Sequence, residues 1–183
     1  MRINLTIDSV HARRLLRKMA ARGQKLPLDK IGMIGVASTR RNIAEGGRPT
    51  PWTPLSKNTI AGGRGKGKGT KPLRDTGLLS QSTFYLKHEP DNVQVLNTMP
   101  YAAAHQFGTK PRTIRPVRAN MLRFFVHGRR GRDAQGRFTG RRSVRYAYEV
   151  RHPGIPARPF VIWQDSDISL IERMLLSHFM RGK

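Results

Sequence analysis

Positive charge is spread unevenly along this chain, and its distribution limits which segments can be buried. The chain has 183 residues, with 35 Lys and Arg against 11 Asp and Glu, a formal net charge of +24. Seven basic residues and no acid lie from Arg48 to Arg74, and fourteen basic residues and two acids lie from Lys110 to Arg158. Because like charges repel in a compact state, these stretches are expected in loops and one hairpin, with a polyanion as the natural partner. Nucleic acid is the leading polyanion, and an acidic protein surface is the alternative.

The hydrophobic pattern of the first 45 residues predicts a strand followed by two helices. Apolar and polar residues alternate over residues 2–8, which is typical of a half-buried strand. Asp8 or Ser9 then caps a helix that has one apolar and one basic face. A second helix is expected over residues 28–45, although each of its two glycines costs about 1 kcal/mol relative to alanine.

The middle of the chain predicts a long loop and several short elements. Residues 46–72 hold seven Gly and four Pro and are expected to form a flexible basic loop. A short helix begun by Asp75 is expected within residues 73–82. The next elements are a hairpin of strands at 83–88 and 93–98 and a short helix at 101–107 that Gly108 closes.

Residues 121–150 predict a hairpin arm with an arginine-rich tip. The apolar run at 121–126 is typical of a buried strand, and alternation predicts a second strand at 143–150. The sixteen residues between them, 127–142, hold six Arg and four Gly. A last helix then begins at Asp165 or Ser166. The sum is one α+β domain over 1–183, an antiparallel sheet packed with N- and C-terminal helices and carrying the long basic loop and the extended hairpin.

No motif in the chain predicts catalysis, a metal site or a cofactor. Residues 62–69 approach a phosphate-binding loop, but Gly69 stands where that loop needs a hydroxyl, and no strand is expected before it. The six His lack ligand spacing, Cys is absent, and the acids are scattered. A protein that is not an enzyme and has no cofactor is therefore expected. No apolar stretch approaches the ~18 residues of a membrane span, so no membrane partner is expected.

Basic residues of the two predicted loops are the candidates for contact with nucleic acid or an acidic partner. Arginine suits phosphate because its planar guanidinium donates two hydrogen bonds at once. The equally weighted alternative for the hairpin tip is a solvated loop that becomes ordered against a neighbouring subunit. The candidates are Arg64, Lys66, Lys68, Arg129, Arg130, Arg132, Arg137, Arg141 and Arg142.

Four short motifs follow one another between residues 51 and 160. They read Pro-Trp-Thr-Pro-Leu-Ser at 51–56, Leu-Arg-Asp-Thr-Gly-Leu-Leu at 73–79, Tyr-Ala-Ala-Ala-His-Gln-Phe-Gly at 101–108 and Ile-Pro-Ala-Arg-Pro-Phe at 155–160. Their order and spacing resemble the phage virion morphogenesis family, the tail-completion proteins of Mu-like and P2-like phages. The expected structural anchors within them are Trp52, Leu55, Asp75, Gly77, Tyr101, His105, Gln106, Gly108, Pro156, Arg158, Pro159 and Phe160.

The resemblance implies a structural virion protein at the phage head–tail interface. Such a protein would serve as a neck, tail-completion or tail-terminator ring, needed for tail completion and head–tail joining. The implied assembly is a ring of copies, a hexamer by expectation, around the DNA exit channel of a virion assembled in the host cytoplasm. Its implied partners are connector or stopper proteins, tail-tube or terminator proteins and packaged double-stranded DNA. Charge alone supports an alternative, a sequence-independent nucleic-acid-binding protein.

Overall fold

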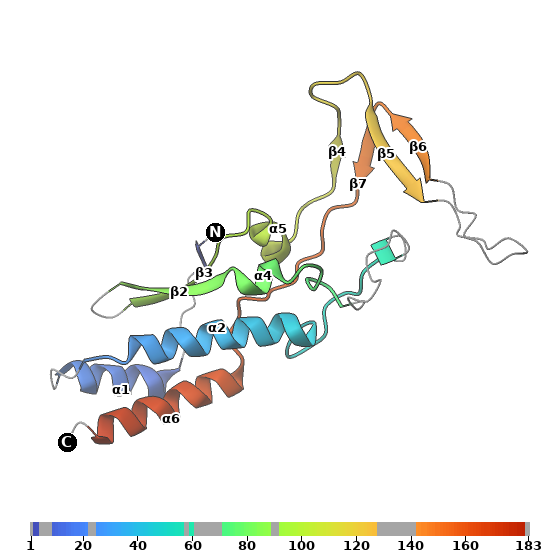
Figure 1. The fold of residues 1–183 in the computed structure, drawn as a ribbon. Helices are drawn as coiled ribbons and strands as arrows, with labels where there is room; N and C mark the ends of the chain where they lie inside the picture. The colour runs from blue at the N-terminus through green and yellow to red at the C-terminus, as the bar shows by residue number, and fades with distance from the viewer. Residues whose placement is uncertain are drawn as a thin grey trace, which may run out of the picture.

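The protein is an α+β structure in which a helical layer and a small sheet carry a projecting β-arm (Figure 1). The computed structural model describes residues 2–3, 9–21, 25–56, 59–60, 71–88, 92–127 and 142–181. The helices are α1 (Val10–Ala21), α2 (Leu28–Glu45), α4 (Leu78–Gln81), α5 (Ala102–Phe107) and α6 (Asp165–Arg181). The strands are β1 (Arg2–Ile3), β2 (Thr83–His88), β3 (Asn92–Asn97), β4 (Arg112–Ile114), β5 (Leu122–His127), β6 (Arg142–Ala147) and β7 (Val150–His152).

The helical layer forms because α1 and α6 bury their apolar stripes against each other and against α2. Its core cluster is made of Ala12, Leu15, Met19, Ile31, Ile171 and Leu175. Ser9 caps α1, since its hydroxyl accepts a hydrogen bond from the Ala12 backbone N–H at 3.2 Å. The last helix predicted from the sequence is confirmed as α6, which begins at Asp165 and buries Ile171 and Leu175.

The glycines of α2 let the helix approach the sheet formed by β1, β3 and β2 in that order. Gly32 lies against the ring of Tyr85, and Gly35 lies against Val95 and Trp163. A side chain at either position would overlap these neighbours, so close packing requires glycine and outweighs its poor helix propensity. The helix predicted over 28–45 is therefore confirmed.

Several predicted boundaries differ from the structure. The β2–β3 hairpin is confirmed, with β3 beginning one residue earlier than expected. The prediction that Asp75 begins a helix is wrong, because α4 starts only after Gly77, whose φ of 81° makes the turn into it. Of the predicted first strand only residues 2–3 are described, in β1, and residues 4–8 lie outside the described residues. The predicted loop after α2 is described at 46–56 and 71–72, where it is irregular, and at 59–60, which are helical.

The arm consists of two short antiparallel ribbons, β4 with β7 and β5 with β6, projecting away from the helices (Figure 1). The predicted single strand at 143–150 is wrong. Seven residues separate β4 from β5 but only two separate β6 from β7, so the pairing cannot continue through the break. The prediction that 121–126 is a buried strand is wrong at 121–124, whose side chains are exposed or half-buried, and the side chains of 125–126 lie outside the described ones.

Replacement of Gly35 by valine tests the approach of α2 to the sheet. The added Cβ would lie 2.7 Å from Val95 Cγ2 and 3.1 Å from the Trp163 ring. We expect Gly35→Val to lower the free energy of unfolding by about 2 kcal/mol through overpacking, measured by urea denaturation. Ala37→Val on the exposed face of α2 is the matched control and should cost only a few tenths of this. Equal losses for the two variants would contradict the packing account.

Acid titration tests the contact between the first turn of α2 and β2. The Asp29 carboxylate accepts hydrogen bonds from Lys87 Nζ at 2.9 Å and Tyr85 Oη at 3.1 Å. These bonds, that from Lys87 first, lower the pKa of Asp29 below its usual 3.8. A lowered folded-state pKa contributes stability above the unfolded-state pKa that is lost as pH falls through the folded-state pKa. We expect Asp29→Asn to be less stable than the wild type at neutral pH, and the two stabilities to converge as pH falls through the lowered folded-state pKa of Asp29. A difference in unfolding free energy between the two proteins that stays constant with pH would argue against this contact.

Candidate functional site

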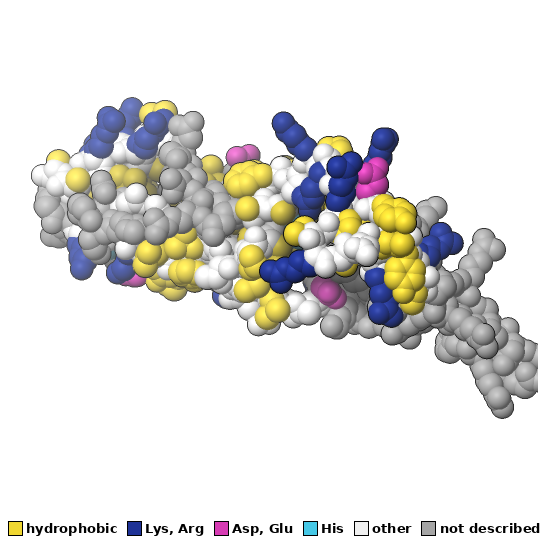
Figure 2. Space-filling view, turned by 90° about the horizontal axis from the view of Figure 1, so that it is seen from above, with side chains coloured by type: hydrophobic (Ala, Val, Ile, Leu, Met, Phe, Trp, Pro, Cys, Tyr) yellow, Lys and Arg dark blue, Asp and Glu magenta, His cyan; other side chains and the backbone are white. Residues whose placement is uncertain are grey.

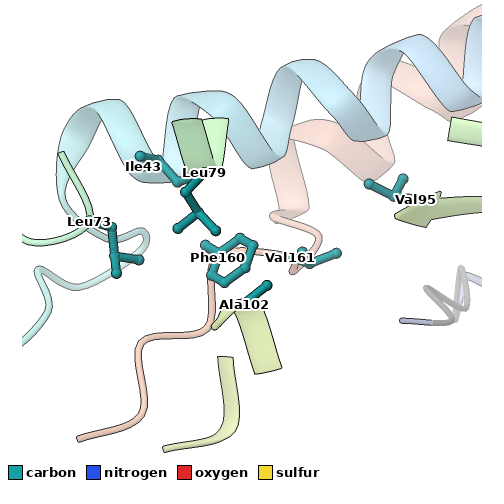
Figure 3. Close-up of a cluster of buried hydrophobic side chains, with 7 residues drawn as sticks. All are labelled: Ile43, Leu73, Leu79, Val95, Ala102, Phe160 and Val161. Atoms are coloured by element: carbon teal, nitrogen blue, oxygen red, sulfur yellow. The ribbon is translucent and has the colours of Figure 1, made fainter. Parts of the chain in front are cut away.

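The four motif segments meet at one core cluster, which we call the motif junction (Figure 3). Phe160, fully buried, belongs to the fourth motif and lies at its centre. Leu73 and Leu79 come from the second motif and Ala102 from the third, while Trp52 of the first motif packs against the cluster, half-buried. The members from outside the motifs are Ile43, Val95 and Val161. Segments more than a hundred residues apart in sequence are thus held together by hydrophobic burial.

Gln106 links the third motif to the fourth through its side-chain amide. Its Oε1 accepts hydrogen bonds from the backbone N–H of Phe160 and of Val161, each at 3.0 Å. Its Nε2 donates to the carbonyl of Val161 at 3.1 Å. The segment around Phe160 lies in no helix or strand, so this one buried amide replaces the ladder bonds that a sheet would supply.

Arg158 links the fourth motif to the first and the third. Its side chain is buried, and its Nε and Nη2 donate to the carbonyl of Thr53 at 3.3 and 3.1 Å. Its backbone N–H donates to the carbonyl of His105 at 2.7 Å. The long loop after α2 is therefore held to the junction by an arginine, and the alkyl stem of that arginine lies inside the protein.

Gly108 stands where the arm leaves the junction. Its φ of 74° disfavours any residue with a Cβ, and a Cβ there would lie 2.8 Å from the carbonyl oxygen of Ile155. Next to it, Thr109 and Ile155 form an antiparallel bridge with hydrogen bonds in both directions. The base of the arm is thus held directly against the third and fourth motifs.

A second polar network, absent from the sequence-based anchors, joins α2, the following loop and α6. Arg48 donates through Nε to Asn42 Oδ1 at 2.7 Å, and its Nη2 lies 3.7 Å from a carboxylate oxygen of Asp167. Asp167 also accepts hydrogen bonds from Ser38 Oγ and from the backbone N–H of Gln164 at the start of α6. Asn42, fully buried, donates to the carbonyls of Phe160 and Ile162 at 2.9 and 3.3 Å.

A shallow pocket of about 450 Å³ opens beside the junction. Tyr101 and His105 form one wall, with their rings in an edge-to-face contact at 5.9 Å. The lining residues all belong to the second and third motifs: Leu73, Asp75, Thr76, Gly77, Leu78, Leu79, Tyr101 and His105. Among the described residues, no group of three or more His, Asp or Glu could hold a metal ion. No helix of the described chain is long and apolar enough to cross a membrane.

The remaining anchors are more exposed than the members of the junction. Leu55 is half-buried, and Pro156 and Pro159 are exposed on either side of Arg158. Most of the predicted contact arginines and lysines lie outside the described residues, and of Arg142 only the backbone is described, paired with His127 in the arm. The structure therefore brings the motif anchors together and leaves the positions of the loop cations open.

Substitution of Gln106 tests the junction. In Gln106→Leu two buried N–H groups and one carbonyl lose their partner, and each such group costs about 1–3 kcal/mol. We expect a destabilisation of at least about 3 kcal/mol and a melting temperature lower by at least roughly 6–12 °C, measured by circular dichroism. Gln81→Leu, the same chemical change on an exposed residue of α4, is the control and should leave the melting temperature nearly unchanged. A Gln106→Leu protein as stable as the control would refute the linking role.

Comparison with known proteins agrees with the motif string. The searches of curated proteins and of solved structures found no match. The family model described as the phage virion morphogenesis family matches residues 7–180, nearly the whole chain and all four motifs of the junction. The chain therefore belongs to the phage virion morphogenesis family.

Proposed function

We propose that this protein is a structural component of the phage head–tail interface, acting in the neck or as a tail-completion or tail-terminator ring. The observation that carries the proposal is the family match over residues 7–180, which includes every segment of the motif junction. Members of a virion morphogenesis family take part in building the particle. The buried polar side chains at this junction, Gln106 and Arg158, form hydrogen bonds with the backbone of other segments. This use of polar groups supports a role in assembly and not in a reaction.

The proposed assembly is a ring of copies around the DNA exit channel, with six subunits by analogy with the family. The arm and the helical layer lie at opposite sides of the subunit, so its two ends present different surfaces (Figure 1). Neighbouring copies would contact each other through their sides, and such heterologous contacts generate a ring when the rotation closes, which leaves the two ends for the two faces of the ring. One face of such a ring would meet a connector or stopper protein and the other a tail-tube or terminator protein.

The mechanism we propose involves no enzymatic reaction and no cofactor. The ring would act by shape and by a positive surface that offsets the phosphate charge of DNA in the channel. The net charge of +24 supports this role, because cations close to phosphates release bound counterions and gain affinity without reading sequence. A ring with this role would be located in the neck of the virion.

Deletion of the gene from its phage tests the proposal. We expect the mutant lysate to contain DNA-filled heads and separate tails that do not join, visible by negative-stain electron microscopy. Infectivity should be restored by the wild-type protein supplied from a plasmid, and the protein should be present in purified wild-type virions. The proposal would be wrong if the deletion mutant made joined, functional tails, or if purified wild-type virions lacked the protein.

The net charge favours one second candidate, a sequence-independent nucleic-acid-binding protein. Such a protein would bind free duplex DNA without its phage partners. Its affinity would then fall with salt at a log–log slope of about −0.9 for each phosphate contacted. A particle component that acts only in a ring would bind free DNA weakly, so a salt titration on naked duplex separates the two candidates.

A further inference from the structure

The projecting arm has no face covered by the rest of the described chain. Its strands pair only within the two ribbons, β4 with β7 and β5 with β6. None of the described side chains at 110–124 and 144–153 is buried. Because an isolated two-stranded ribbon is marginally stable in water, an arm of this kind gains stability when another surface covers it.

Both faces of the β5–β6 ribbon carry an aromatic ring next to an arginine. Residues that pair across the strands share a face, and the faces alternate along each strand. Phe124 is paired with Arg145 on one face, and Arg123 is paired with Tyr146 on the other. A ribbon that lay on its own protein would have one apolar and one polar face, whereas this ribbon offers apolar area on both.

Five exposed apolar and aromatic side chains, distributed over both faces of the arm, make up what we call the arm patch. Two of them stand out because most of their surface meets solvent, Val117 with 95% and Tyr148 with 71% exposed. Seen down onto the arm, hydrophobic side chains lie among Lys and Arg side chains right of centre in Figure 2. The patch comprises Val117, Met121, Phe124, Tyr146 and Tyr148.

The arm is also strongly basic. Its described segments, 109–127 and 142–155, hold eight Lys and Arg against one acid, Glu149. That acid already forms an ion pair with Arg115 at 3.0 Å. A surface that covers the arm must therefore supply negative charge together with apolar area.

We propose that the arm patch docks onto an acidic protein surface of another virion component. Tyr, Phe, Met and Arg are the residues enriched at the centres of protein–protein interfaces, whereas Lys is depleted there, and seven of the eight arm cations are Arg. A phosphate backbone would neutralise the arginines but would leave Val117 and Met121 in water. This inference deepens the proposed function and rests on it, because the partner is sought within the particle.

A second copy of the chain fits the arm less well than an acidic partner does. The chain carries +24, so arm and body of two copies repel at long range. Two of the exposed carboxylates of the body already have cationic partners at short distance: Asp29 pairs with Lys87 at 2.9 Å, and Glu45 pairs with Arg41 at 2.6 Å. Charge complementarity thus points to a different protein.

Two arm variants and one matched control test the inference. Tyr146→Ser with Tyr148→Ser removes aromatic area without changing charge, and Arg118→Glu with Arg145→Glu reverses charge on the arm. Arg14→Glu with Arg17→Glu makes the same charge change on the exposed face of α1. All six residues are exposed, so unchanged melting temperatures are expected and are checked first.

The measurement is co-sedimentation of each labelled, full-length protein with heads and with tails purified from the deletion phage and treated with DNase. We expect both arm variants to bind one particle type at least about tenfold more weakly than the wild type, and the α1 control to bind within about twofold. If the wild type bound neither particle, whether or not the particles had been treated with DNase, the proposed function itself would fail. If the wild type and both arm variants bound alike, only the docking inference would fail.

Three further outcomes would overturn the inference in favour of another partner. Equal losses for the arm and α1 charge variants would indicate non-specific electrostatic attraction. Particle binding abolished by DNase, with matching losses on a naked duplex probe, would indicate nucleic acid. If, in sedimentation velocity without particles, the wild type were an oligomer and the tyrosine variant a monomer, the partner of the arm would be a second copy of this chain.

Discussion

A buried chain segment that belongs to no helix or strand is the constraint on which the rest of the structure depends. Residues 158–162 connect the arm to the start of α6, and the side chains of Arg158, Phe160 and Val161 are buried. Each backbone N–H and C=O there needs a partner, because an unpaired buried polar group costs about as much as a lost hydrogen bond. Side chains from distant elements supply those partners. Gln106 accepts hydrogen bonds from the N–H groups of Phe160 and Val161 and donates one to the carbonyl of Val161. Asn42 donates hydrogen bonds to the carbonyls of Phe160 and Ile162.

This constraint explains the buried polar residues and the glycine of the family motifs. Gln106 and Arg158 are polar residues whose buried side chains bond to backbone groups, and Gly108 is required by a close approach. Substrate-directed polar groups would instead point into an accessible cavity. The pocket beside the junction is shallow, and its one aromatic pair, Tyr101 with His105, has its two rings in contact with each other. A motif string of this kind identifies the family through the packing of its fold.

The long helices and the central hairpin could be predicted from sequence because their patterns are local and repeat over several turns or residue pairs. The short strands β4 and β7 could not, since three residues show no period and their pairing joins positions almost forty residues apart. The exposure of 121–124 was also beyond prediction, because an apolar run is the same whether its own chain or a partner covers it. The motif resemblance singled out Gln106 and Arg158, although their partners lie too far away in sequence to be inferred. Asn42 and Asp167 were not identified as anchors, since single polar residues in amphipathic helices are ordinary.

Within this chain the junction contributes stability, whereas the arm carries the exposed side chains that we propose for docking. The arm begins at the Thr109–Ile155 bridge, directly after Gly108 and before Arg158, so its base is held by the most constrained part of the core. Its outer ribbon is held by its own pairing alone among the described elements. A rigid base fixes where the arm points, which lowers the entropy lost on docking, while the exposed ribbon keeps its aromatic and arginine side chains for the interface. Weakening the junction should therefore impair docking even when every arm residue is intact, because the direction of the arm is set by hydrogen bonds made by residues outside it.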